Sequence, residues 1–310
     1  MNGSPTFTVV IPTARASSLP AAIRSIYAQT FASWELLLVG QADDSAVRAA
    51  VQSMPPDPPR LRYLHVPIAG LSRARNAGLA RARGEMVAFM DDDCEAAPDW
   101  LAVLAALFDQ HPDVEFIGGS MLAPPKPSGT GLGRCPHWEP PEILYDPLAC
   151  QHQRPTGFGF VGGNFAFRRT VIDKVGLFDP RLGVGAVFPA AEDTDYLLRL
   201  DARGIKMLST PRSVVHHSDG WRYGLAAVLR HQRARGIGNG ALAAKRTMSG
   251  DRRGREELRQ HVTEFRGALL RLQRPEGAWY VPHFWLGYRQ CMRQYAVDEA
   301  GLLRPRRVRL

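Results

Sequence analysis

The chain has 310 residues, of which 45% are hydrophobic and 22% are charged. These proportions are typical of globular proteins and exclude disordered, collagen-like and coiled-coil chains, and the length suits one large or two modest domains. The formal net charge of +9 is unevenly distributed. Residues 1–221 contain 20 Lys and Arg against 23 Asp and Glu (−3), whereas residues 222–310 contain 19 against 7 (+12). The basic character therefore belongs to the C-terminal tail.

The chain carries no clear signal for export or membrane insertion. Residues 1–16 lack a basic segment followed by an apolar one, and no apolar run approaches the roughly 20 residues that cross a bilayer. The four cysteines form no CxxC pair and no dense framework, which suits a reducing compartment. We therefore expect a cytoplasmic protein.

The N-terminal part alternates short apolar runs with amphipathic stretches. We expect strands over residues 7–11, 34–39, 61–66, 86–90 and 114–117, the first of them ended by Pro12. We expect helices after the capping residue Ser18, over residues 72–83 and over residues 98–110. Strands separated by helices of this length predict an α/β fold with a mostly parallel sheet and right-handed crossovers.

The pattern changes after residue 119. Residues 120–163 are rich in Pro and Gly and have no periodicity, which is typical of a long functional loop. A strand over 165–167, a short helix ending at Val175, a helix over 192–202 and a short strand at Val214 and Val215 are then expected. Beyond Trp221, helices are expected over residues 223–246, 256–272 and 282–297.

Asp91, Asp92 and Asp93 directly follow the expected strand over residues 86–90. Three adjacent carboxylates at the end of a buried strand repel one another unless a cation or ligand is present, and open α/β sheets bind ligands at such ends. Asp91 and Asp93 form a DxD pair whose oxygens suit Mg²⁺ or Mn²⁺. A solvated acidic turn that caps the next helix is the alternative.

Three further groups could act beside these carboxylates. Glu192 and Asp193 open a helix, where a carboxylate serves either the helix dipole or as a general base. Arg75, within the stretch from Gly70 to Gly78, could donate to phosphate or base oxygens. His216 and His217 follow a strand and could complete a metal site, or could be ordinary surface or core histidines.

Together these features resemble glycosyltransferase family 2, inverting enzymes that use nucleotide sugars and have a GT-A fold. The matching segments span about residues 6–220 in order: TVVIPT, WELLLV, GLSRARNAGLARARGEMVAFMDDD, GGNFAFRR, VGLFD, AEDTDYLLRL and VVHH. The resemblance implies a Rossmann-like, mostly parallel sheet flanked by helices over residues 1–221. Its nucleotide-sugar half would cover about residues 1–119 and its acceptor half about 120–221. Residues 222–310 would be a basic helical extension.

The resemblance also implies roles for individual residues. The catalytic pair would be Asp193 with Glu192 beside it. A Mn²⁺ or Mg²⁺ ion would be held by Asp93 and Asp91, with His216 or His217. The nucleotide sugar would contact Pro12, Thr13, Arg15, Gln41, Asp43, Arg75, Asn76, Asp91, Asp92, Gly163 and Asn164.

The sequence departs from the family after WELLLV, where the family places an Asp that reads the nucleobase. Here the text is Gly40-Gln41-Ala42-Asp43-Asp44. Either Gln41 or Asp43 takes over this role, or the base is held differently. UDP is the family's usual nucleotide, and GDP and dTDP remain open.

The reaction that the resemblance implies is a single in-line displacement at the anomeric carbon. The divalent ion would neutralise the diphosphate while Asp193 accepts the acceptor's proton. The acceptor would be a glycan, a lipid-linked molecule or a small molecule, in polysaccharide, glycolipid or natural-product glycoside synthesis. The alternatives are a catalytically silent sugar-nucleotide-binding or scaffold protein, and a nucleotidyltransferase, whose Gly-rich phosphate loop is poorly matched by PTARASS.

Two smaller hypotheses concern metals and membranes. Two C-x-H pairs, Cys135 with His137 and Cys150 with His152, offer four zinc ligands, although zinc sites more often use C-x₂₋₄-C spacing. The basic tail carries no nucleic-acid motif, so we expect no nucleic-acid partner. Its arginines and aromatic residues suit peripheral contact with the inner face of an anionic membrane, with a packed helical annex as the alternative; the aromatic residues are Trp279, Tyr280, Phe284 and Trp285.

Overall fold

The computed structural model describes residues 4–42, 44–52, 60–125, 133–218, 222–251 and 275–306. Asp43, Trp221 and the helix expected over residues 256–272 lie outside these ranges. Strands and helices alternate through the first two hundred residues, and long helices follow. The elements are β1 (Phe7–Thr13), α1 (Leu19–Tyr27), β2 (Trp34–Gln41), α2 (Ser45–Gln52), β3 (Leu61–Val66), α3 (Leu71–Leu79), β4 (Met86–Met90), β5 (Cys94–Ala96), α4 (Trp100–Gln110), β6 (Phe116–Leu122), β7 (Gly133–Arg134), β8 (Ile143–Tyr145), β9 (Asn164–Arg168), α5 (Val171–Val175), α6 (Glu192–Ala202), β10 (Met207–His217), β11 (Arg222–Tyr223), α7 (Gly224–Met248), α9 (Pro275–Gln294), β12 (Tyr295–Val297) and β13 (Leu303–Pro305).

The described residues build a nine-stranded central sheet in the order β3-β2-β1-β4-β9-β6-β10-β5, with β8 paired to β10. The strands β3, β2, β1 and β4 pair in parallel with one another, and β6 is parallel to β10. The strand β9 is antiparallel to both β4 and β6. The predicted α/β architecture is confirmed, as a mixed sheet in which β9 joins two parallel parts.

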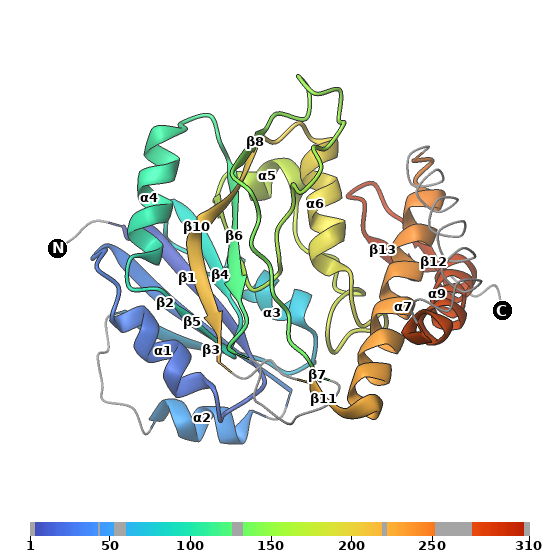
Figure 1. The fold of residues 1–310 in the computed structure, drawn as a ribbon, viewed down its shortest axis with the longest axis horizontal. Helices are drawn as coiled ribbons and strands as arrows, with labels where there is room; N and C mark the ends of the chain where they lie inside the picture. The colour runs from blue at the N-terminus through green and yellow to red at the C-terminus, as the bar shows by residue number, and fades with distance from the viewer. Residues whose placement is uncertain are drawn as a thin grey trace.

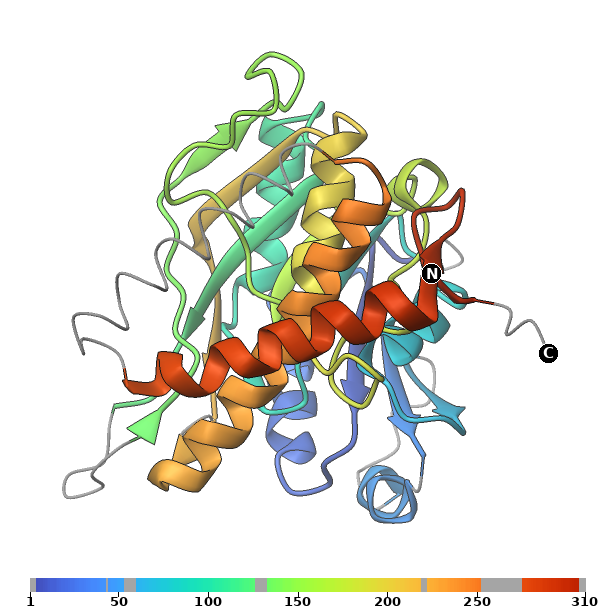
Figure 2. The same cartoon turned by 90° about the vertical axis from the view of Figure 1, so that its right-hand side faces the viewer.

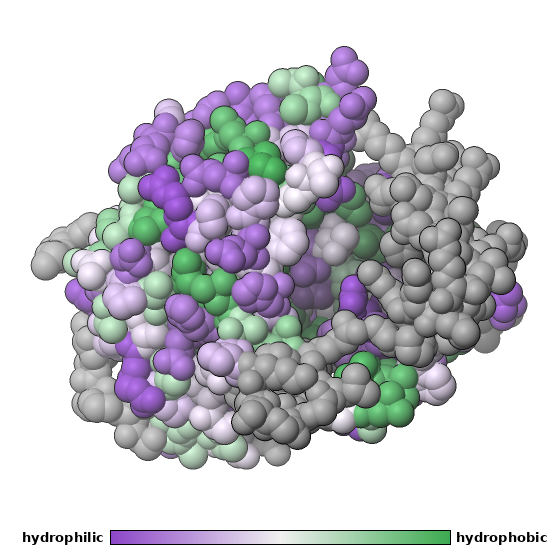
Figure 3. Space-filling view, viewed as in Figure 1, coloured by the Kyte–Doolittle hydropathy of each residue, from purple (hydrophilic) through white to green (hydrophobic). Residues whose placement is uncertain are grey.

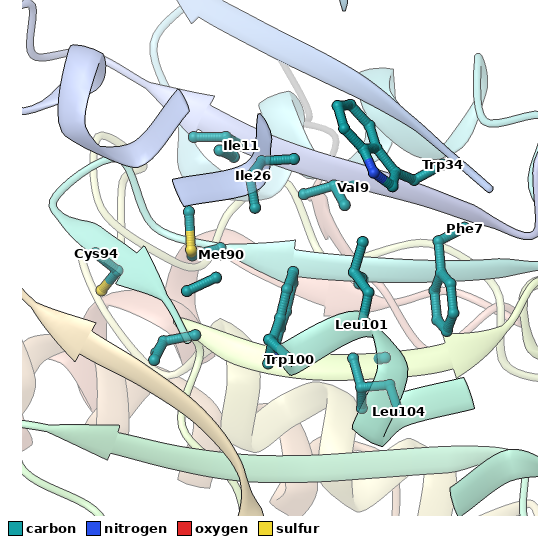
Figure 4. Packing of buried hydrophobic residues seen from close by; sticks show 14 of the residues in the cluster. Phe7, Val9, Ile11, Ile26, Trp34, Met90, Cys94, Trp100, Leu101 and Leu104 are labelled. Carbon is teal, nitrogen blue, oxygen red and sulfur yellow. The ribbon is translucent and has the colours of Figure 1, made fainter. Parts of the chain in front are cut away.

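Two apolar cores cover the two faces of this sheet. Alternate residues of β1 point to opposite faces, as a strand requires: Phe7, Val9 and Ile11 belong to one core and Val10 to the other. The first core packs under α1 and α4, and Figure 4 shows part of it. The second packs under α3, α5 and α6. Figure 1 shows these helices on either side of the sheet, with α7 and α9 beyond α6.

The sequence located most elements and missed some. The first strand continues through Pro12, which pairs with Val39. Pro12 lies beyond the last β1–β4 pair, Val10 with Phe89, so its missing N–H falls where β1 has a neighbour on one side only. The final strand, β10, is much longer than the predicted pair of valines. The three-residue strands β5 and β8 and the helix α2 were not predicted.

The C-terminal helices α7 and α9 cross one another closely (Figure 2). Glycines make this approach possible: a Cβ built on Gly236 would lie 2.5 Å from the carbonyl oxygen of Tyr280, and Gly240 and Gly287 similarly abut the opposing backbone. The chain then forms the hairpin β12–β13. Among the described residues, no helix has the length and apolar character needed to cross a bilayer.

Candidate active site

The three consecutive aspartates follow β4 and turn directly into β5. Although adjacent, their side chains have different partners. Asp92 and Asp93 are each 6% exposed, whereas Asp91 is partly exposed. This turn therefore distributes three carboxylates among three neighbouring segments of the chain.

Asp92 holds the end of β1. One of its carboxylate oxygens accepts hydrogen bonds from the Thr13 hydroxyl (3.0 Å) and from the N–H groups of Ala14 (3.0 Å) and Arg15 (3.1 Å). Burial raises the pKa of Asp92, while the bond from Ala14 and the charge of Arg15 lower it. Asp92 thus fixes the segment that carries Thr13 and Arg15.

Asp93 lies between Arg15 and His217. It pairs with the Arg15 guanidinium, and its other oxygen lies 3.8 Å from Nε2 of His217. The β5–β10 ladder creates this arrangement because it pairs His217 with Cys94. His217 is buried and His216 is exposed. Of the two histidines, the structure brings His217 to the carboxylates.

Asp93, Cys94 and His217 form the group of possible metal ligands found among the described residues, with one ligand atom of each within 4.8 Å of the others. A carboxylate suits Mn²⁺ or Mg²⁺, and an imidazole beside it favours Mn²⁺ over the harder Mg²⁺. Burial and the neighbouring aspartates raise the pKa of the Cys94 thiol, and a soft sulfur donor suits Mn²⁺ or Mg²⁺ less well than oxygen does. The donors therefore fit an ion held by Asp93 and His217.

Arg75 connects the aspartate turn to the second acidic pair. This fully buried side chain, on α3, donates to Oε1 of Glu192 (3.1 Å) and to the carbonyl of Gly162 (2.8 Å), and it lies 3.8 Å from Asp91. Its guanidinium carbon lies 5.5 Å and 5.4 Å from the rings of Phe165 and Phe178, a cation–π arrangement. One cation therefore sits between two carboxylates and a strip of backbone.

Glu192 and Asp193 begin α6, after Ala191 in a left-handed conformation (φ 73°). Glu192 is 7% exposed, and its pKa is raised to about 7, first by burial and then by Asp193, against the opposing effect of Arg75. Asp193 is half-buried, and its Oδ1 accepts the N–H of Thr194 (2.7 Å). The helix start thus presents a buried acid and a more accessible one.

Gly162 and Gly163 lie between the two acidic groups. A Cβ on Gly162 would lie 3.3 Å from Oδ2 of Asp193, and one on Gly163 would lie 2.8 Å from Oδ2 of Asp91. Both glycines are buried, and the lack of a side chain lets these carboxylates, with Arg75 and Met121, approach the backbone closely. Asp91 is only partly withdrawn from water, and this desolvation raises its pKa to about 6, with Arg75 lowering it and the adjacent aspartates raising it.

Several residues predicted to contact the nucleotide sugar form hydrogen bonds with other parts of the protein in this structure. Asn76 exchanges two 2.9 Å hydrogen bonds with the backbone of Phe178. Asn164 is fully buried and bonds the Trp100 indole and the carbonyls of Ser120 and Ser213. Gln41 accepts the N–H of Gly70 at 2.9 Å, at the start of α3.

The side chains of Tyr63 and Asp44 meet at the turn after β2, a contact that the sequence did not reveal. Gly40 leaves room for the hydroxyl of Tyr63, which contacts the buried carboxylate of Asp44. Arg48 also pairs with Asp44 (3.3 Å).

Pro12 is buried in β1, opposite Val39. A further candidate missed from sequence is Gly162, which the double glycine in VGGNFAF could have signalled.

The structure gives no support to the zinc hypothesis. Nδ1 of His152 lies 3.4 Å from Oδ1 of Asp201, and Nδ1 of His137 accepts the N–H of Ala123 at 3.2 Å. These histidines and their neighbouring cysteines do not gather into a metal-ligand group in the part of the chain described above.

The fold is that of GT-A glycosyltransferases. The mannosyltransferase PcManGT from Pyrobaculum calidifontis, solved with GDP-Man and Mn²⁺, superposes with a TM-score of 0.57 at 18% identity, over 94% of this chain and 88% of its own. The S. aureus protein TarS, solved with UDP-GlcNAc, superposes with a TM-score of 0.54 at 16% identity, over 75% of this chain and 66% of that one.

Sequence comparison gives the family. The model of glycosyl transferase family 2 matches residues 8–176, so the chain belongs to that family. It is 24% identical over 213 residues to a glucosyl-dolichyl phosphate glucuronosyltransferase from Haloferax volcanii, covering 66% of this chain and 65% of that protein. It is 26% identical over 208 residues to the succinoglycan biosynthesis protein ExoM from Rhizobium meliloti, covering 66% and 64%. The chain spans from 18% to 65% of the first three curated relatives that it matches. The family and fold support glycosyl transfer.

The raised pKa of Glu192 predicts how stability responds to pH. The folded chain holds this proton more tightly than the unfolded chain, whose Glu pKa is 4.5, so ionisation of Glu192 costs stability as pH rises towards 7. Glu192→Gln removes the titration. Between pH 5 and pH 8, the unfolding free energy of E192Q should gain roughly 2–3 kcal/mol on wild type, measured by urea denaturation with a chelator present.

Asp113→Asn is the control. The pKa of Asp113 is lowered by its hydrogen bond with Lys206, so this carboxylate is ionised throughout that pH range. The difference between D113N and wild type should therefore stay constant. A constant difference for E192Q as well would contradict the assignment of the titration to Glu192.

Proposed function

We propose that this protein is a metal-dependent, inverting glycosyltransferase that moves a sugar from a nucleoside-diphosphate sugar to an acceptor hydroxyl. UDP is the first candidate nucleotide because it is the usual choice of the family that the sequence resembles. One observation carries the proposal: Arg75 joins Asp91 of the aspartate turn to Glu192, and the Gly162–Gly163 strip lets both acidic groups approach its backbone. Such a site can hold a sugar between a leaving group and a base.

In this proposal Asp193 is the general base. Its Oδ1 is held by the N–H of Thr194, and its Oδ2 faces the place where a side chain on Gly162 would stand. An acceptor hydroxyl approaching over the glycine strip would meet this oxygen and give up its proton to it as the new bond forms. Displacement from the opposite face of the sugar inverts the anomeric centre. Glu192 does not take the proton in this proposal; it orients Arg75 through their ion pair.

The other end of the strip would hold the diphosphate. Asp93 and His217, with Asp91, would hold a Mn²⁺ or Mg²⁺ ion, which when bound supplies positive charge for the leaving group. Arg15 is 56% exposed beside Asp93 and can donate to phosphate oxygens. Asp92 keeps Thr13 and Arg15 in place, while Asn76, Gln41 and Asn164 shape the walls. Pro12 and Gly163 would lie directly beside the donor.

The acceptor and the location of the protein are also proposals. A glycan, a lipid-linked molecule or a small molecule would approach from residues 120–163 and from the C-terminal helices. The outer face of α9 exposes Trp279, Pro282 and Leu286, followed by Arg289 and Arg293. On the face drawn in Figure 3, apolar surface gathers over the start of α7, where Leu225 is 60% exposed. This combination supports peripheral contact of a cytoplasmic protein with an anionic membrane.

The base assignment predicts that Asp193→Asn abolishes transfer without loss of donor binding. A thermal-shift panel of nucleoside-diphosphate sugars with Mn²⁺ would first identify the donor, since a binder stabilises the fold. Release of nucleoside diphosphate in D193N should then fall by about 10²–10⁴-fold, because the hydroxyl keeps its proton. Calorimetry should give a donor Kd within about twofold of wild type. Asp173→Asn, at an exposed carboxylate on α5, is the control. Near-normal turnover by D193N would refute the assignment.

The metal assignment predicts a contrast between neighbouring histidines. Asp93→Ala and His217→Ala should each remove most of the Mn²⁺-dependent gain in donor affinity, measured by calorimetry with and without Mn²⁺. His216→Ala should retain that gain, because His216 is exposed while His217 faces Asp93. Equal effects of H216A and H217A would contradict the assignment.

The membrane contact predicts salt-sensitive binding to vesicles. Wild type should float with phosphatidylglycerol-containing liposomes at low salt and be released at high salt, because exposed arginines attract the surface only within a Debye length. R289E/R293E should lower the bound fraction, whereas Arg212→Glu, at an exposed position on β10, should not. Absence of flotation at low salt would exclude the contact.

A further inference from the structure

The turn that precedes Glu192 packs against the backbone of α7. A Cβ built on Gly238 would lie 2.6 Å from the carbonyl oxygen of Ala190 and 2.7 Å from its carbonyl carbon. Ala191, the next residue, has the left-handed conformation that L-amino acids with a side chain seldom adopt (φ 73°). A single glycine of α7 therefore borders the unusual turn from which the catalytic pair projects.

A buried lysine makes the second connection from α7. Nζ of Lys245 lies 2.9 Å from Asp179 and 2.6 Å from Asp195, and all three side chains are at most 5% exposed. Asp195 is in the first turn of α6, two residues after Asp193. Asp179 also accepts the N–H of Leu303, in β13. Lys245 thus ties the start of α6 to the C-terminal hairpin.

The intervening loop, residues 179–191, is fixed on both sides. On one side Leu182 and Phe188 pack with side chains of the C-terminal elements: Ala241, Ala244, Cys291, Tyr295 and Leu303. On the other side the Leu182 carbonyl accepts the hydroxyl of Ser72 (2.7 Å), on the helix that carries Arg75. A Cβ on Gly183 would lie 3.1 Å from the Glu192 carboxyl. The loop therefore extends from α3 to the C-terminal elements, and the Glu192 side chain packs against it at Gly183.

We propose that Gly238 and Lys245 of α7 are positioning residues that set the location of Glu192 and Asp193. This proposal rests on the proposed role of Asp193 as the base. Gly238 gives the Ala190–Ala191 turn the space to enter α6, and Lys245 fixes the register of the first turn through Asp195. The basic C-terminal region thereby completes the active site without touching the substrate.

Gly238→Ala tests this inference against a matched control. The new methyl group must displace Ala190, whereas Gly236→Ala places the same group against Tyr280 of α9, away from the active site. Both variants gain the same helix propensity and meet a backbone oxygen at a similar distance. G238A should lose about 10-fold or more in kcat at an unchanged donor KM, because small misplacements of a base are costly. G236A should lose stability while keeping kcat per folded molecule.

Amide hydrogen exchange gives a readout that is independent of turnover. Residues 190–195 should exchange faster in G238A than in wild type, and at the wild-type rate in G236A. If wild type turns over no donor, the proposed function fails while this comparison still tests the coupling. Unchanged exchange over 190–195 in G238A, or kcat losses equal to those of G236A, would overturn the inference.

Lys245→Met provides the second test. It leaves Asp179 buried without a cation, while Asp195 keeps Arg199 at 3.0 Å, and an unpaired buried carboxylate destabilises strongly. K245M/D179N removes the lysine together with one carboxylate, so that Asp195 and Arg199 remain as a neutral pair. The double variant should fold, with exchange over residues 190–195 faster than in wild type and kcat lowered at an unchanged donor KM. Wild-type kcat and exchange in the folded double variant would refute the role of Lys245.

Discussion

The candidate site depends on the ion pairs that the buried guanidinium of Arg75 makes with two carboxylates. The guanidinium lies between two carboxylates from different parts of the fold: Asp91 follows β4, and Glu192 begins α6. It also donates to the carbonyl of Gly162. A charge withdrawn from water must be compensated nearby. The aromatic rings of Phe165 and Phe178 exclude solvent from it, so the carboxylates and carbonyl cannot be replaced by water. The need to compensate the charge of Arg75 thus brings together the segments that carry Asp91, Gly162 and Glu192.

The central antiparallel strand β9 gives this arrangement its geometry. It separates β4 from β6 and begins at Asn164, directly after the glycine strip. Because Asn164 bonds Trp100 and one carbonyl each of β6 and β10, the strip is anchored on its C-terminal side. The fold thereby places a side-chain-free backbone beside the acidic groups while keeping its support in the core.

Sequence reasoning succeeded where the signal was local. The aspartate turn after β4 and the acidic start of α6 are short patterns attached to clear strand and helix periodicity. It could not choose between His216 and His217, because that choice depends on the ladder between β10 and β5, a strand too short to show periodicity. It also could not see that Asn76 and Asn164 satisfy buried backbone groups, since an amide that binds a ligand and one that binds a carbonyl look alike in sequence. The placement of Lys245 depends on contacts with Asp195 and Asp179, which are 50 and 66 residues earlier in the chain.

The bond between Asp179 and the N–H of Leu303 has a consequence for how the protein folds during synthesis. The 124-residue separation means that Asp179 is synthesised well before its partner exists. The sheet can therefore form while the loop at 179–191 still lacks its cover of C-terminal side chains. The start of α6 then acquires its full set of contacts only after residue 303 has been translated.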